Sequence, residues 1–263
     1  MTVSEEKFTR QTLTEVRSWS PSLFSLRCTR DAGFRFRAGQ FVRLGVRKAS
    51  GCIVWRAYSV VSAPHDDYLE FFSIVVPGGE FTSELSRLRS GDELLVEKQA
   101  TGFLTLDRFP DGRDLWLIGT GTGLAPFMSV IQDPETYERF EKVILVHGVR
   151  YVNEVAYREF ITQHLPQNEF FGEAVKEKLI YYPTVTREPF ENQGRLTDLM
   201  RSGKLFEDIG LPPINPQDDR AMICGSPSML DETSEVLDSF GLKISPRMRE
   251  PGDYLIERAF VEK

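Results

Sequence analysis

Hydrophobic positions in the first hundred residues recur in short alternating runs, rich in β-branched and aromatic side chains and broken by turns. Six such runs predict six strands, at residues 8–19, 23–29, 40–46, 55–62, 68–76 and 92–100. Strands of this length at this spacing favour an antiparallel β-barrel. The segment TSELSRLRSG (82–91) has the spacing of a helix, with Thr82 or Ser83 as its cap and Gly91 at its end. We expect this helix to close one end of the barrel.

After about Thr105 the pattern changes to apolar strands that alternate with helices. The expected pairs are 115–120 with 124–131, 142–149 with 154–165, 178–186 with 196–200, and 221–225 with 228–240. This order predicts an α/β unit around a parallel sheet. The fold class is therefore two-domain, β plus α/β, with a barrel at 1–104 and an α/β domain at 105–263. Residues 211–220, LPPINPQDDR, are expected to form a loop.

Composition limits the function classes. The chain has 263 residues, 41% of them hydrophobic, which describes a globular protein with no apolar run long enough for a membrane span. The start, MTVSEEKFTR, does not have the pattern of a signal peptide. A net charge of −7 argues against general nucleic-acid binding. Three cysteines without a CxxC pair, and three histidines, predict no bound metal and a reducing cytoplasmic location.

Ligands of parallel sheets bind at the carboxyl ends of the strands, and three expected strand ends read GTGTG, HGVR and CGSP. The loop IGTGTGLAP (118–126) departs from GxGxxG because Pro126 replaces the third glycine, and it lacks the GK[ST] ending of a P-loop. Its position between a strand and a helix suits a pyrophosphate, although a simple tight turn is the alternative.

The residues after the second and third strands of the α/β half bear on the choice between NADPH and NADH. The second strand ends in HGVR and lacks the Asp or Glu of an NAD-type site, while TREPFENQGR carries Arg187 and Arg195. Guanidinium groups suit a phosphate monoester, which favours NADPH over NADH. The alternative is that both arginines form surface ion pairs with Glu188 and Glu191.

A second phosphate site is predicted in the barrel half. Alternation in RAYSVVS (56–62) places Arg56, Tyr58 and Val60 on one face, and Ala57 and Ser59 on the other. This run alone could be an ordinary barrel strand. The glycines of GGEFTSEL (78–85) precede the expected helix in a second phosphate-compatible arrangement. Two phosphate sites imply two nucleotides.

Seven motifs occur in order along the chain: RAYS, GGEFTSEL, GTGTGLAPF, HGVR, TREPFENQGR, CGSPSML and RAFVEK. Because of these seven motifs, the chain resembles the bacterial ferredoxin/flavodoxin–NADP reductases over nearly its whole length. The resemblance implies an FAD-binding barrel and an NADP-binding α/β domain. It also implies hydride transfer between NADPH and flavin N5, with one-electron transfer to ferredoxin or flavodoxin.

The resemblance assigns FAD contacts in the barrel. It implies that Arg56 binds the FAD pyrophosphate and that Thr82 binds the FAD phosphates. Tyr58 would stack on the isoalloxazine ring, and Ser59 would form a hydrogen bond near the flavin N5. The remaining expected FAD contacts there are Ala57, Phe72, Ser73, Ile74 and Gly79. At the chain end, the resemblance implies that Ala259 replaces the aromatic that covers the flavin in plant-type relatives. Phe260 would then stack on the FAD adenine, with Val261 beside it.

The same resemblance assigns the NADP(H) contacts. They are Thr120, Gly121 and Gly123 in the glycine loop, Arg150 at the pyrophosphate, and Arg187 with Arg195 at the 2′-phosphate. Cys224 would lie beside the nicotinamide, and Glu257 occupies the place of the plant-type catalytic glutamate. The expected catalytic set is Ser59, Cys224, Glu257 and Ala259.

The sequence does not identify the electron acceptor. Acidic carriers such as ferredoxin or flavodoxin predict a basic rim near the flavin, for which Arg43, Arg47, Lys48 and Arg87 are the choices. The alternatives are a reductase that serves free flavin or an oxygenase, and a flavin-binding regulator without activity. A monomer is expected because a carrier must reach the flavin edge.

Overall fold

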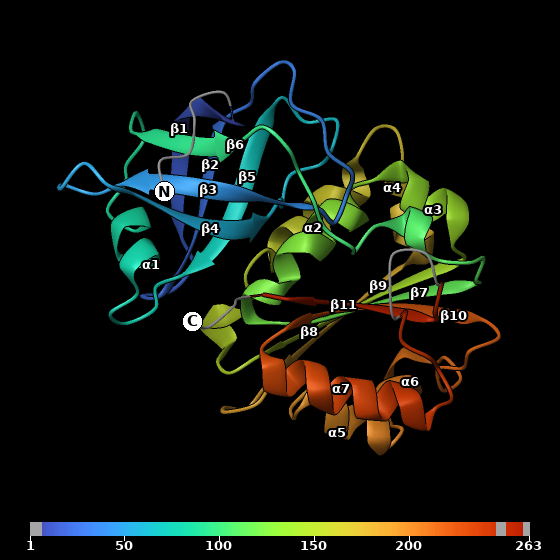
Figure 1. Cartoon of the computed structure of the whole chain (residues 1–263). Helices are drawn as coiled ribbons and strands as arrows, with labels where there is room; N and C mark the ends of the chain where they lie inside the picture. Colours follow the sequence, from blue (N-terminus) through green and yellow to red (C-terminus); the bar gives the residue numbers. More distant parts are fainter. Residues whose placement is uncertain (1–6, 246–250, 260–263) are drawn as a thin grey trace.

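The computed structural model describes residues 7–245 and 251–259, and it has two packed domains (Figure 1). Six antiparallel strands form the first domain, in the order β4-β3-β6-β1-β2-β5. They are β1 (Phe8–Ser18), β2 (Leu23–Thr29), β3 (Phe41–Arg47), β4 (Ile53–Ser59), β5 (Tyr68–Ile74) and β6 (Glu93–Glu97). Each coincides with a predicted strand to within a few residues.

The two edge strands of this sheet meet and close it into a barrel. Val60, just after β4, forms an antiparallel bridge with Phe71 of β5. The Val61 amide donates to the Glu70 carbonyl oxygen at 2.8 Å. The interior is filled by buried apolar side chains from alternating positions, including Leu44 and Leu94.

The barrel helix is shorter than predicted and capped differently. Helix α1 spans Glu80–Leu85, starts after Gly79 and has no side-chain cap. The Thr82 hydroxyl instead accepts a hydrogen bond from the Val76 amide at 3.1 Å. Gly91 does not end the helix. It has φ +94° and forms the turn into β6, where its amide donates to the Leu13 carbonyl at 2.8 Å. The glycine is used for strand entry because its positive φ is unfavourable for other residues.

The second domain has a five-stranded parallel sheet in the order β11-β10-β7-β8-β9. Its strands are β7 (Asp114–Thr120), β8 (Lys142–Val149), β9 (Leu179–Val185), β10 (Asp219–Gly225) and β11 (Tyr254–Arg258). The predicted two-domain β plus α/β fold class is confirmed.

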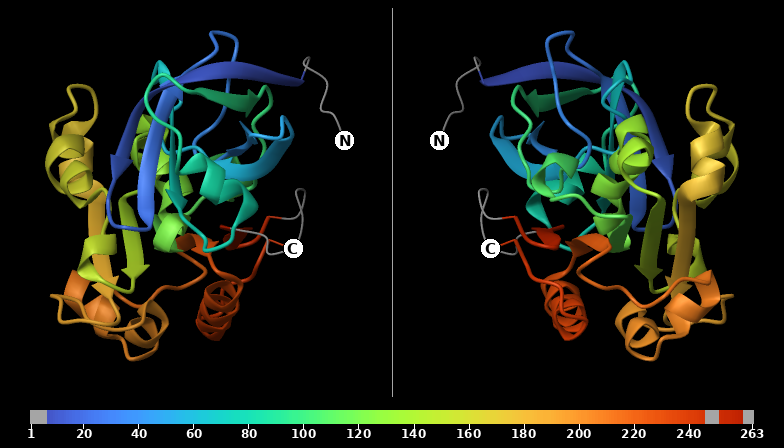
Figure 2. Two further views of the ribbon diagram at one scale, coloured as in Figure 1. Left: turned by 90° about the vertical axis from the view of Figure 1, so that its left-hand side faces the viewer. Right: turned by 90° about the vertical axis from the view of Figure 1, so that its right-hand side faces the viewer.

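Helices cover both faces of the parallel sheet. On the barrel side lie α2 (Ala125–Ile131), α3 (Pro134–Arg139) and α4 (Gly172–Lys178), and on the other side lie α5 (Leu196–Arg201), α6 (Lys204–Ile209) and α7 (Pro227–Ser239). Figure 2 shows α7 on the side of the sheet away from the barrel. One apolar cluster joins α2 to Val61 and Phe72 of the barrel, so the two domains share a core. In the described part of the chain, no helix has the length and apolar character needed to span a membrane.

The single helix predicted at 154–165 is wrong. Residues Val152–Glu154 form a 3₁₀ turn, Tyr157 takes a left-handed backbone with φ +61°, and Phe160–His164 form a π-helical turn. The Tyr157 side chain is buried between the rings of Trp19 and Phe72. Contacts with the barrel therefore override the local helical pattern.

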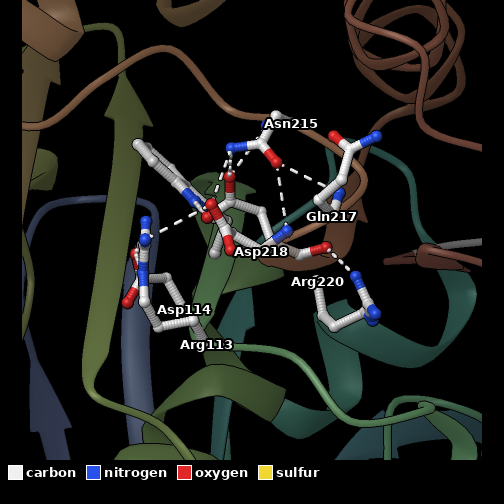
Figure 3. Close-up of polar contacts among 8 residues, drawn as sticks. Arg113, Asp114, Asn215, Gln217, Asp218 and Arg220 are labelled. Atoms are coloured by element: carbon white, nitrogen blue, oxygen red, sulfur yellow. Dashed lines mark hydrogen bonds and ion pairs between the residues drawn. The ribbon is translucent and has the colours of Figure 1, made fainter.

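The loop at 211–220 organises the amino-terminal edge of the parallel sheet, opposite the expected ligand edge (Figure 3). The Asn215 side chain accepts hydrogen bonds from the Gln217 and Asp218 amides, both at 3.0 Å. Asp219 accepts from the Trp116 indole at 3.0 Å and from the Asn215 amide at 2.7 Å. The polar residues of this loop are thus used to satisfy backbone groups.

Candidate functional site

The glycine loop and the end of β10 are in direct contact at the carboxyl edge of the parallel sheet. A Cβ added to Gly123 would lie 2.2 Å from the Cys224 carbonyl oxygen, and one added to Gly225 would lie 2.6 Å from the Thr120 hydroxyl. Gly121 has φ +54°, and a Cβ there would meet no atom within 4 Å. Two glycines therefore permit close packing, while the third leaves open backbone for a ligand.

His147, the first residue of HGVR, is part of this site, although the sequence alone assigned it no role. It is fully buried on β8, and its Nε2 lies 3.1 Å from the Gly121 carbonyl oxygen. Burial lowers the pKa of His147 to about 4, so the ring is neutral at pH 7. A carbonyl can only accept, so Nε2 carries the proton and donates to Gly121. The position of histidine one residue before a strand-end glycine is the signal that could have indicated this role.

Cys224 and Glu257 are adjacent across β10 and β11, at paired positions of the two strands. Cys224 is buried, and burial together with the Glu257 charge raises the pKa of its thiol well above the usual range. The thiol is therefore protonated at neutral pH and is not an activated nucleophile.

Glu257 also connects the two domains. Its Oε2 accepts a hydrogen bond from the Phe103 amide at 3.3 Å, and a Cβ on Gly102 would lie 3.2 Å from the same oxygen. Burial raises the pKa of Glu257 to about 7, although the Phe103 amide acts in the opposite direction. A carboxyl group with this pKa exchanges a proton readily at neutral pH.

The RAYS motif lies on β4 at the barrel edge. Its register pairs Arg56 with Leu44 and Tyr58 with Val42, two buried positions, in agreement with the expected alternation. The Tyr58 hydroxyl lies 2.9 Å from the Ser73 hydroxyl on β5, and burial raises the pKa of Tyr58 to about 12.

The remaining barrel residues of the expected FAD site surround this pair. Phe72 and Ser73 are buried and Ile74 is partly buried on β5, while Ala57 is exposed and Ser59 partly buried on β4. Gly79 lies at the start of α1.

Arg187 lies near Arg150 at the outer end of the sheet. The Arg187 amide donates to the Arg150 carbonyl at 2.9 Å, and the Arg187 guanidinium lies 5.8 Å from the Tyr151 ring centroid. Both arginines are exposed. Arg195 instead forms an ion pair with Glu232 at 3.3 Å.

The alternative pairing of these arginines with the neighbouring glutamates is wrong. Glu191 pairs with Arg158 at 2.9 Å, and Glu188 accepts from the Val152 amide. Arg187 therefore does not form the surface ion pair with Glu188 or Glu191 that the alternative expected.

The chemistry of the donor set fits two anionic nucleotides. The Arg56 guanidinium donates only to the Trp55 carbonyl among the hydrogen bonds of the described residues, and its strand, β4, packs against α1. Arg150 and Arg187 form no ion pair with any carboxylate in the part of the chain that the structure describes. Exposed guanidinium groups at both ends of the site are suited to phosphate oxygens.

Ala259 continues from β11, and its amide donates to the Gly225 carbonyl at 3.1 Å. This bond places it at the carboxyl edge beside the glycine loop. The expected contacts at Phe260 and Val261 lie outside the described residues.

Comparison with known proteins identifies both domains. The model of the oxidoreductase FAD-binding domain matches residues 11–102, and that of the oxidoreductase NAD-binding domain matches residues 117–235. A ferredoxin–NADP reductase from Azotobacter vinelandii is 68% identical over 94% of this chain and 96% of the relative. A flavodoxin/ferredoxin–NADP reductase from Rhodobacter capsulatus is 44% identical over 95% and 93%.

A solved structure agrees with these relatives. The crystal structure of a ferredoxin NADP+ reductase from Neisseria gonorrhoeae with bound FAD and NADP is similar to this chain with a TM-score of 0.87 and 34% identity. The similarity covers 97% of this chain and 99% of that one. The chain belongs to the ferredoxin–NADP reductase family.

Proposed function

We propose that this protein is an FAD-dependent oxidoreductase that transfers electrons between NADPH and ferredoxin or flavodoxin. Residues 1–104 would bind FAD and residues 105–263 would bind NADP(H). FAD, when bound, accepts a hydride at N5 and gives up electrons one at a time, which couples a two-electron donor to a one-electron carrier. The contact of Glu257 with the Phe103 amide carries the proposal, since it joins the ligand edge of the parallel sheet to the barrel.

The side chains of the site have separate roles in this proposal. Arg56 and Thr82 hold the FAD phosphates, and Tyr58 and Ser59 face the flavin ring. The glycine loop, with Thr120, Gly121 and Gly123, and the side chains of Arg150, Arg187 and Arg195 bind the second nucleotide. Opening of the Arg195–Glu232 ion pair, which is solvent-exposed, would cost about 1 kcal/mol or less.

The residues nearest the reacting atoms would exclude water and hold one proton. Neutral Cys224 flanks the nicotinamide, and Ala259 leaves room for that ring to stack. Glu257 has a pKa of about 7 and can hold or release a proton at the domain boundary. No side chain has to remove a proton from the nicotinamide, because a hydride carries its proton with the electron pair.

The electron carrier is proposed to bind a basic rim on the barrel. Of the four expected rim residues, Lys48 pairs with Glu80 at 2.8 Å and Arg87 pairs with Glu84 at 3.1 Å. Arg43 and Arg47 are exposed and thus more accessible to an acidic partner. The Rhodobacter capsulatus relative, whose name includes both carriers, supports flavodoxin as well as ferredoxin. We further propose a monomeric cytoplasmic protein.

An anaerobic absorption spectrum before and after one equivalent of NADPH tests the proposal. A yellow protein that bleaches with NADPH, and is reoxidised by added ferredoxin or flavodoxin, is the expected result. A yellow protein that stays oxidised would favour a non-catalytic flavin-binding regulator. A protein that remains colourless after flavin has been offered would contradict the barrel assignment.

A further inference from the structure

Helix α2 is joined to the barrel by two buried hydrogen bonds. The Ser129 hydroxyl donates to the Ser62 carbonyl, and the Gln132 side-chain amide donates to the Val61 carbonyl, both at 2.8 Å. Ser129 and Ser62 are essentially inaccessible, and Gln132 is 9% exposed. The acceptors are backbone groups just after β4, so both bonds restrain the backbone of the barrel directly.

A third buried contact crosses the same interface. The Tyr157 hydroxyl donates to Glu70 Oε1 at 2.7 Å, and Glu70 Oε2 accepts from Arg27 at 2.7 Å. The Tyr157 ring lies 4.6 Å from that of Trp19 and 5.3 Å from that of Phe72. The tyrosine keeps its φ of +61° because these contacts hold it in place.

The three acceptors belong to one unit of the barrel. The Val61 amide donates to the Glu70 carbonyl at 2.8 Å, and the Glu70 amide donates to the Ser62 hydroxyl at 3.1 Å. This unit directly continues β4, which carries RAYS, and it includes the start of β5. Ser129 lies on α2, which follows the glycine loop, Gln132 lies at the C-terminal cap of that helix, and Tyr157 lies on the segment after β8 and Arg150.

We propose that Ser129, Gln132 and Tyr157 form an interdomain clamp that sets the distance between the two nucleotides. The inference rests on the proposed function, because it takes RAYS and the glycine loop as the two nucleotide sites. The shared apolar core alone is non-directional and permits small sliding movements. Hydrogen bonds of this length are directional, so three of them fix both the separation and the rotation of the domains. The three donors are thus positioning residues and do not touch the reacting atoms.

The test uses Gln132→Leu and Tyr157→Phe in the FAD-loaded protein. The phenylalanine retains the ring contacts with Trp19 and Phe72 but lacks the hydroxyl. Tyr182→Phe is the matched control, because its hydroxyl donates to Asp208 at 2.6 Å on the opposite face of the sheet. Ser129→Ala is a milder variant that loses one hydroxyl and keeps the packing, in case a larger change impairs folding.

Stopped-flow reduction at saturating NADPH should slow about tenfold in the clamp variants, given that a misplacement of about 1 Å can cost about 100-fold. The dissociation constant of NADP+, measured by difference spectroscopy, should not change. Hydrogen exchange of the Val61 and Glu70 amides should accelerate in the variants even without bound nucleotide.

Reduction rates that match those of Tyr182→Phe, or amide exchange unchanged from the wild type, would overturn the clamp. A loss confined to NADP+ affinity would also overturn it, because the residues would then act on binding. A wild-type protein that NADPH does not reduce would refute the proposed function, and the exchange measurement would still test the clamp.

Discussion

The carboxyl group of Glu257 should make stability depend on pH in a way that a single substitution removes. Glu257 lies at the domain boundary, where burial raises its pKa from 4.5 to about 7. The folded chain therefore binds this proton more tightly than the unfolded chain does. Ionisation of Glu257 destabilises the fold progressively as the pH rises from 4.5 towards 7, and the cost is constant above that range.

The magnitude follows from the two pKa values. One unit corresponds to about 1.36 kcal/mol, so the ionised carboxylate costs at most ~3 kcal/mol above pH 7. About 2 kcal/mol of this cost develops between about pH 5.5 and 8.5. Glu257→Gln removes the charge and keeps an oxygen that can accept from the Phe103 amide. The free energy of unfolding of the variant, relative to that of the wild type, should therefore increase by about 2 kcal/mol between about pH 5.5 and 8.5.

Urea unfolding of the nucleotide-free protein at a series of pH values measures this difference. Glu138→Gln is the matched control, because Glu138 is exposed and its substitution removes one negative charge without uncovering a buried group. A gap between Glu257→Gln and the wild type that stays constant from about pH 5.5 to 8.5 would refute the reasoning. A stability difference between the two proteins that decreases as the pH rises would show that the folded structure stabilises the ionised carboxylate of Glu257.

Three other predictions follow from the site. His147→Phe removes the hydrogen bond that holds the partly exposed Gly121 carbonyl, and a loss of about 1 kcal/mol of loop order should raise the NADP+ dissociation constant roughly tenfold without loss of FAD. Equal NADP+ affinity of the variant and the wild type in a titration would contradict this. Arg187→Ala should weaken binding of NADP+ about tenfold or more and leave that of NAD+ nearly unchanged, because only the former has a 2′-phosphate; calorimetry with both nucleotides decides it. In the native protein iodoacetamide should modify exposed Cys52 and spare buried Cys224; mass spectrometry that finds Cys224 alkylated would show that the site opens.

The local hydrophobic pattern was sufficient to predict the strands and helices in which buried and exposed positions alternate regularly. The barrel strands and the main strands and helices of the parallel sheet lie where the pattern predicts them. Four elements had no such signal, namely α3, α4, α6 and β11. Each has only five or six residues or, in α4, seven. Length alone is not the reason, because α1, α5 and β6 are equally short and lie in predicted segments. A short element shows less than two full turns or only a few alternations, so tertiary contacts define it where no clear periodic run or flanking turn marks it.

Motif order was sufficient to indicate the family and its FAD-binding and NAD-binding domains, but not the partners of individual side chains. Arg187 and Arg195 occur in the same short motif, yet among residues 7–245 and 251–259 only Arg195 forms an ion pair, with Glu232 of a later helix. Gly91 has the position of a helix end and is used instead to enter a strand. In both cases the decisive neighbour is distant in the chain.

The sequence by itself determined the two-domain fold, the alternation of each strand and the position of the glycine loops, because backbone sterics and side-chain periodicity act over a few residues. Only the tertiary structure decided that Glu257 meets the Phe103 amide across 154 positions and that Tyr157 meets Glu70 across 87. Packing of the domains buries Glu257 and raises the pKa of its carboxyl group, and the Tyr157 contact is part of the proposed clamp. Both contacts depend on how two separately formed units pack, which no local pattern specifies.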